Sequence, residues 1–214
     1  MPAEQALAAV LSHESRFGQL LIQQTSAGGF VVCHRDDENP AHLKSLHRAE
    51  DAIEIARFDQ AGKYRPLKTA PNLRRGWKLE VLDLGELRRA LDYFYPGRLA
   101  MLAAMTEHQV FATPLRETLG RQSGMYRIAA SISDEQIDEV VARTCRSHGG
   151  CLRTILWKRD ARGTVPSTKL PPEKFDPAYD QTGRGEKAIP LLCQEICSLL
   201  LNECRKAVKG EQDE

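Results

Sequence analysis

Four of the six cysteines occur as two close pairs, and this spacing constrains the fold more than any other feature of the sequence. Cys145 and Cys151 enclose a segment with two adjacent glycines, which let the backbone curl until both sulfurs face one point. Cys193 and Cys197 lie four residues apart in a predicted helix, so both project from one helix face. If the four thiolates converge, the 41 residues between the pairs must return the chain to one site.

Four converging thiolates suit either zinc or an iron–sulfur cluster. Structural zinc sites have about two to four residues between paired cysteines, whereas the first pair here has five and the second has three. This spacing favours a [4Fe-4S] cluster, whose negative charge the positive end of a helix would stabilise. Zinc stays open as the alternative. His148 could replace one cysteine as a ligand, but beside two glycines it is interpreted as a solvent-facing loop residue.

The other two cysteines are excluded as ligands. Cys204 lies eleven residues after Cys193, which is roughly 16 Å along a helix and too far for one compact cluster. Cys33 lies in a predicted strand, where a cysteine ordinarily behaves as a small hydrophobic residue. The competing interpretation is that all six are unrelated core or surface thiols.

The first 80 residues predict a small α+β unit with a β-hairpin. A glycine-containing turn at residues 26–29 joins the two strands of the hairpin. Residues 64–77 contain two prolines, a glycine and four basic residues, so we expect an ordered connector there. The predicted helices span 3–13 and 49–58, and the predicted strands span 17–23 and 30–34.

From residue 79 the pattern favours helices, with one strand at 152–157 and a long proline-rich loop at 160–190. Ser133 and Gln136 have the spacing of a capping box. We expect an α+β protein, with the α+β unit at 1–80 followed by a helix-rich, cysteine-bearing domain at 81–214. The predicted helices span 85–94, 98–107, 113–118, 133–145 and 191–209.

With these features the chain resembles the 4Fe-4S cluster-binding domain, with its stabilising domain, of chelatase-like proteins related to sirohydrochlorin cobaltochelatase (CbiX-like). The resemblance rests on residues 64–77, 94–97, 115–129, 145–151 and 191–206. It implies that Cys145, Cys151, Cys193 and Cys197 ligate a [4Fe-4S] cluster, and that residues 1–80 are the stabilising unit.

The chain departs from such proteins in having no room for chelatase modules and no recognisable metal-inserting histidine motif. Its six histidines are scattered, at positions 13, 34, 42, 47, 108 and 148. We therefore expect an accessory or electron-transfer protein of tetrapyrrole or cobalamin metabolism rather than a chelatase. Its partner would be a separate chelatase or a redox protein.

Five cations lie within 14 residues, beside Trp77. The ordinary interpretation is a solvated connector, and the functional alternative is an anion-binding strip for a carboxylate-rich tetrapyrrole. A second hypothesis for the protein is a zinc-stabilised, non-catalytic interaction module that binds an anionic partner through this strip. A third is a metal-free domain whose thiols sense oxidation. The strip consists of Arg65, Lys68, Arg74, Arg75 and Lys78.

The net charge of +1 offers no overall attraction for nucleic acid or an anionic membrane. The apolar runs are far shorter than the roughly 20 residues of a spanning helix, and the N-terminal residues lack the basic start of a secretory signal. We therefore expect a cytoplasmic protein without nucleic-acid or membrane partners, in a reducing compartment that keeps thiols available for metal.

Overall fold

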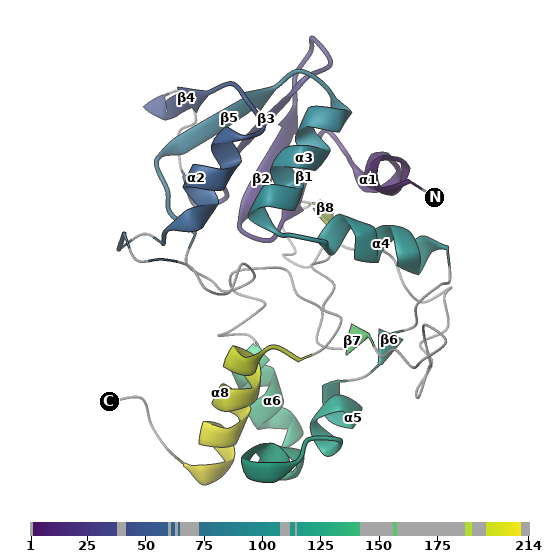
Figure 1. Ribbon diagram of the computed structural model, residues 1–214, viewed down its shortest axis with the longest axis vertical. Coiled ribbons are helices and arrows are strands. Elements are labelled where there is room, and N and C mark those ends of the chain that lie inside the picture. The colour runs from purple at the N-terminus through teal and green to yellow at the C-terminus, as the bar shows by residue number, and fades with distance from the viewer. Residues whose placement is uncertain are drawn as a thin grey trace.

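The computed structural model describes residues 2–37, 42–59, 61–62, 64, 73–107, 112–113, 115–141, 156–157, 187–189 and 196–210. Its first region is a six-stranded mixed sheet in the order β4-β5-β3-β2-β1-β8. In Figure 1 this region fills the upper half, and a group of short helices lies below it. The strands are β1 (Glu14–Phe17), β2 (Leu20–Gln24), β3 (Phe30–His34), β4 (Lys44–Leu46), β5 (Trp77–Val81) and β8 (Lys187–Ile189).

The predicted hairpin is confirmed, but the strand expected at 17–23 is in fact two strands. Gly18, with a φ of 64°, reverses the chain between β1 and β2. A Cβ at Gly18 would lie 2.6 Å from Cζ of Tyr95, so the turn also needs glycine to let that ring approach. Gly18 and Gln19 were interpreted as part of one strand because apolar residues precede and follow them, at Phe17 and at residues 20–22.

Three further strands of the sheet, β4, β5 and β8, were not expected from the sequence. β5 replaces the start of the helical pattern expected from residue 79, and its alternation of buried and partly exposed residues is typical of a strand with one covered face. β8 falls within the region expected to be an irregular loop. The rest of that loop lies outside the described residues.

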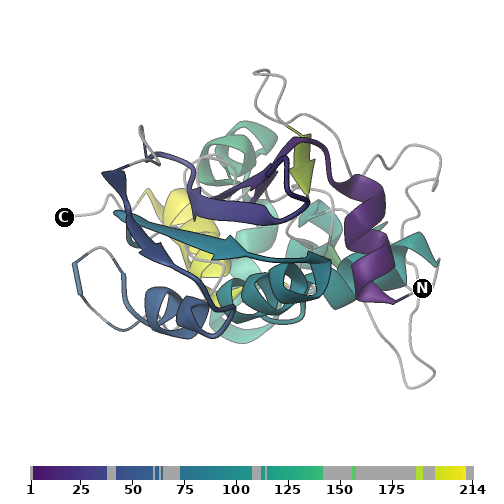
Figure 2. The same ribbon diagram turned by 90° about the horizontal axis from the view of Figure 1, so that it is seen from above.

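Four helices accompany the sheet: α1 (Ala3–Val10), α2 (Asp51–Arg57), α3 (Leu84–Phe94) and α4 (Arg98–Thr106). α2 and α3 lie side by side on one face of the sheet, as Figure 2 shows from above. α3 begins where Asp83 accepts a hydrogen bond from the N–H of Glu86. Gly97, with a φ of 73°, makes the predicted turn between α3 and α4.

The core of this region is rich in aromatic side chains. Trp77 stacks on Phe94 with ring centroids 5.1 Å apart, and Tyr95 meets Phe17 edge-on at 5.4 Å. Phe94 and Tyr95, in the aromatic run at 93–95, are both buried. α3 and α4 contribute to the same core as the sheet. The division of the chain between residues 80 and 81 stays a prediction.

The second region is built mainly from short helices around a smaller core. Its elements are β6 (Ala112–Thr113), α5 (Leu115–Gly120), the 3-10 helix η2 (Gly124–Ser131), α6 (Asp134–Val141), β7 (Leu156–Trp157) and α8 (Ser198–Lys209). β6 and β7 pair antiparallel. In the described part of the chain, no helix has the length and apolar character needed to cross a membrane.

The predicted capping box at the start of α6 is confirmed. The N–H of Gln136 donates to Oγ of Ser133 at 3.2 Å, and the N–H of Ser133 donates to Oε1 of Gln136 at 3.0 Å. The prediction of one last helix from residue 191 is wrong. α8 begins at Ser198, because Cys197 has an extended backbone (φ −74°, ψ 153°) and caps the helix.

Candidate metal centre

Of the four predicted ligands, Cys197 is the one that the structure describes. Cys145, Cys151 and Cys193 lie outside the described residues. Since Cys197 precedes α8 with an extended backbone, the expectation that Cys193 and Cys197 share a helix face is wrong. Among the residues that are described, no three His, Cys, Asp or Glu side chains gather as a metal site. The described region therefore offers no competing centre to the predicted one.

Cys197 occupies the N-cap of α8, and its local chemistry suits a metal ligand. Its Sγ accepts a hydrogen bond from the N–H of Leu200 at 3.4 Å, and the residue is partly exposed. N–H groups of a first helical turn, together with the positive end of the helix dipole, stabilise a thiolate.

α6 and α8 are antiparallel neighbours. Nε2 of Gln136, in the first turn of α6, donates to the carbonyl of Ala207, near the end of α8, at 2.9 Å. Figure 1 shows the two helices side by side, running in opposite directions. The end of α6 at Val141 and the start of α8 after Cys197 therefore lie at the same end of the pair.

The remaining cysteines are buried. Cys33 is 1% exposed and Cys204 is not exposed. Burial raises the pKa of Cys33 to about 11, aided by the charges of Asp37 and Glu14. Burial, with a smaller effect of Cys197 and Glu203, raises the pKa of Cys204 to about 11. Both are inert thiols at neutral pH.

Two of the predicted anion-binding cations already have carboxylate partners. Arg75 pairs with Asp36 at 3.1 Å, and Nζ of Lys78 lies 2.8 Å from Glu80. Lys78 holds the pKa of Glu80 below its usual value, chiefly through their hydrogen bond. The carbonyl of Arg74 accepts the indole N–H of Trp77 at 2.7 Å. Arg65 and Lys68 lie outside the described residues, so anion binding by the strip stays a prediction.

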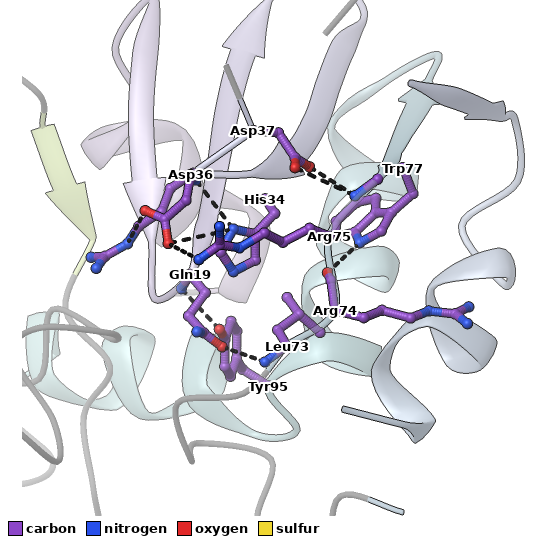
Figure 3. A network of polar contacts seen from close by, with 11 residues as sticks. Gln19, His34, Asp36, Asp37, Leu73, Arg74, Arg75, Trp77 and Tyr95 are labelled. Carbon is purple, nitrogen blue, oxygen red and sulfur yellow. Dashed lines mark hydrogen bonds and ion pairs between the residues drawn. The ribbon is translucent and has the colours of Figure 1, made fainter. Parts of the chain in front are cut away.

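Asp36 and Asp37 have a structural role that no pattern in the sequence indicated. Besides the Asp36–Arg75 ion pair, the carboxylate of Asp37 accepts the N–H of Gly76, with its nearer oxygen at 3.2 Å (Figure 3). These contacts join the end of β3 to the residues before β5. No local spacing signals them, because the two residues of each pair are 39 positions apart in the sequence.

A second, buried set of hydrogen bonds lies beside this contact. The N–H of Gln19 donates to the hydroxyl of Tyr95 at 2.9 Å, and its Oε1 accepts the N–H of Leu73 at 2.8 Å (Figure 3). Gln19 is 4% exposed, so these bonds satisfy groups that have lost water. The turn between β1 and β2 is thereby fixed to α3 and to the chain entering β5.

The sequence matches two family models in succession. Residues 3–106 match the model described as the DR2241 stabilising domain, and residues 107–206 match the 4Fe-4S iron-sulfur cluster binding domain. The resemblance inferred from the sequence is confirmed by both matches, as is the expected cofactor. No curated protein matches the sequence.

The chain is also similar to a solved structure, that of DR2241 from Deinococcus radiodurans. The two are 25% identical with a TM-score of 0.54, over 98% of this chain and 41% of that one. DR2241 is described as a multi-domain protein with structural similarity to chelatases and with two additional novel domains. This chain thus spans about two fifths of the length of that relative.

Proposed function

This chain joins a DR2241 stabilising domain to a 4Fe-4S cluster-binding domain, and from that premise we propose that it is an accessory electron-transfer protein. Its cluster would be held by Cys145, Cys151, Cys193 and Cys197. When bound, a [4Fe-4S] cluster supplies a one-electron couple. The role of the protein chain is then to hold four thiolates, limit access of water and set the surrounding charge.

The observation that carries this proposal is the antiparallel pairing of α6 and α8. Cys145 follows the last residue of α6 by four positions, and Cys197 caps the start of α8. Because those two ends lie together, one ligand of each pair starts from the same end of the helix pair. The hydrogen bond from Gln136 to Ala207 joins the opposite ends of the same two helices, which pack against each other.

The first turn of α8 would act directly on the metal-bound sulfur. The N–H of Leu200 points to Sγ of Cys197, and hydrogen bonds to cluster sulfurs tune reduction potentials. Cys204, one turn beyond Leu200 and buried, would remain protonated and outside the ligand set. The helix thus separates a ligand thiol at its N-terminus from an inert thiol in its interior.

The proposed partner is a chelatase or a redox protein of tetrapyrrole or cobalamin metabolism in the cytoplasm. Support comes from the relative DR2241, which is described as similar in structure to chelatases. In this chain the two matched domains follow each other directly, over residues 3–206. An anionic tetrapyrrole could approach the basic strip at Arg74, whose side chain is partly exposed.

The test is anaerobic purification or reconstitution, followed by analysis of iron, acid-labile sulfide and zinc. We expect about four irons and four sulfides per chain, with a reversible one-electron couple. Separate alanine variants of the four proposed ligands should each lose most of the iron. The matched controls are Cys33→Ala and Cys204→Ala, which should keep it. Stoichiometric zinc in place of iron would contradict the proposal and favour the zinc-stabilised module.

A further inference from the structure

β8 belongs to the cluster-binding half of the sequence but pairs within the sheet of the other half. It runs parallel to β1, with Ser15 opposite Lys187 and Phe17 opposite Ile189. β1 is joined to its other neighbour, β2, by a tight turn. Almost the whole length of the chain, in contrast, separates β1 from β8.

Such a pairing needs an anchor. The entropic cost of closing a loop rises with its length, and a three-residue edge strand offers few backbone hydrogen bonds in return. Ile189 supplies the anchor, since its side chain is fully buried in the core of the sheet region. It lies in register with Phe17, whose ring packs against Tyr95.

The strand is also close in sequence to the candidate metal centre. Cys197 follows Ile189 by eight residues, a length of chain that spans at most about 29 Å when fully extended. Leu200, in the first turn of α8, is buried in the core of the other region. A short connector, with Cys193 at its middle, therefore joins the two cores.

We propose that β8 is a strap whose attachment to β1 is coupled to cluster binding, and that Ile189 is the positioning residue of this strap. The inference rests on the proposed function, because it takes Cys193 and Cys197 as ligands. While β8 is attached, the ligand segment is held near the sheet and has fewer conformations to lose on binding iron. Coupling of this kind is reciprocal, so loss of the cluster weakens the attachment of β8.

The coupling has a structural consequence at the sheet edge. When β8 detaches, the outer edge of β1 exposes backbone N–H and carbonyl groups. The remainder of the sheet keeps its neighbours, because β1 still pairs with β2 along its whole length. Cluster loss should therefore open one edge of the sheet and leave its centre intact.

The experiment uses the full chain, loaded and cluster-depleted under anaerobic conditions, in hydrogen exchange. Depletion should raise exchange in residues 14–17 and 187–189 by about tenfold, a usual size for coupling between sites. Exchange in β3 and β5 should stay unchanged. This measurement needs no variant, so it holds even if a substitution prevents folding.

The reciprocal measurement is the rate of iron loss to a chelator. Ile189→Ala should speed it by about the same factor of ten, and Ile189→Val should restore most of the difference. The matched control is Ile55→Ala, which removes the same atoms from an equally buried site on α2, a helix that packs beside α3. That variant should lose iron at the wild-type rate.

The outcomes separate the two proposals. A loaded chain whose β1 and β8 exchange is unaffected by depletion overturns the strap and leaves the proposed function standing. The same holds if Ile189→Ala and Ile55→Ala lose iron equally fast. A wild-type chain that takes up neither iron nor sulfide overturns the proposed function, and the strap with it.

Discussion

The sheet region buries aromatic rings and sheet strands under four helices, whereas the helical region buries mostly aliphatic side chains of short helices against one another. Among the described residues the first core has 27 buried members and the second has ten. The first also has the hydrogen bonds of Gln19 and Tyr95, which tie distant segments together. These features make the sheet region a stable support in its own right.

Among the described residues, the helical region has the smaller core. Small cores usually need an added constraint such as a disulfide or a metal. The proposed ligands flank this core, since Cys145 follows α6 and Cys197 precedes α8. The cluster would therefore stabilise the region with the smaller described core, while the sheet region depends on its own packing.

The largest expected effect is that of removing the cluster. Metal-binding free energy contributes directly to folding in small metal-dependent domains, so we expect amide exchange in α6 and α8 to rise by at least about a hundredfold. The centre of the sheet should keep its protection. Hydrogen exchange of loaded and depleted protein measures both. An equal loss of protection in both regions would show that the sheet region also depends on the cluster.

A smaller effect, confined to the sheet region, is expected of the substitution Tyr95→Phe. The change leaves the buried N–H of Gln19 without its acceptor, which should lower the free energy of unfolding by about 1–3 kcal/mol. Urea denaturation measures this, with Tyr93→Phe on the same helix end as control. Iron content should be unchanged; a fall in iron would show that the two regions are less independent than their cores indicate.

The smallest effect is a pH dependence centred on His34. This side chain is 2% exposed, and its Nδ1 accepts the N–H of Asp36 at 3.1 Å. Burial lowers the pKa of His34 below its usual 6.5, against the smaller opposing effects of Asp36 and Asp37. The unfolded chain therefore binds the proton more readily than the folded one. The stability contributed by neutral His34 is complete above pH 6.5 and is lost as the pH falls towards the lowered pKa.

For one proton, the free energy of unfolding should change by no more than about 1.4 kcal/mol per pH unit. It is measured by urea denaturation at several pH values below 6.5. In His34→Gln the slope should flatten over this range. An unchanged slope would show that groups other than His34 cause the pH dependence of stability.

Local patterns were sufficient for much of the fold. The hairpin turn, the break at Gly97 and the Ser133–Gln136 capping box depend on neighbouring residues, and each was predicted correctly. The turn at Gly18 and the strand β5 were missed. Both depend on contacts with residues remote in sequence: Gly18 with Tyr95, and β5 with β3.

From the sequence, the spacing of the paired cysteines favoured a [4Fe-4S] cluster over zinc and the domain resemblance implied one, which the matched domain confirms. Only the tertiary structure decided that α8 starts at Ser198, that Gln136 joins α6 to α8, and that β8 joins the sheet. The physical reason is the distance along the sequence between the residues that determine each feature. Thiol chemistry and turn propensity are properties of a few adjacent residues, whereas a shared core and a parallel strand pair form between segments that the chain brings together only on folding.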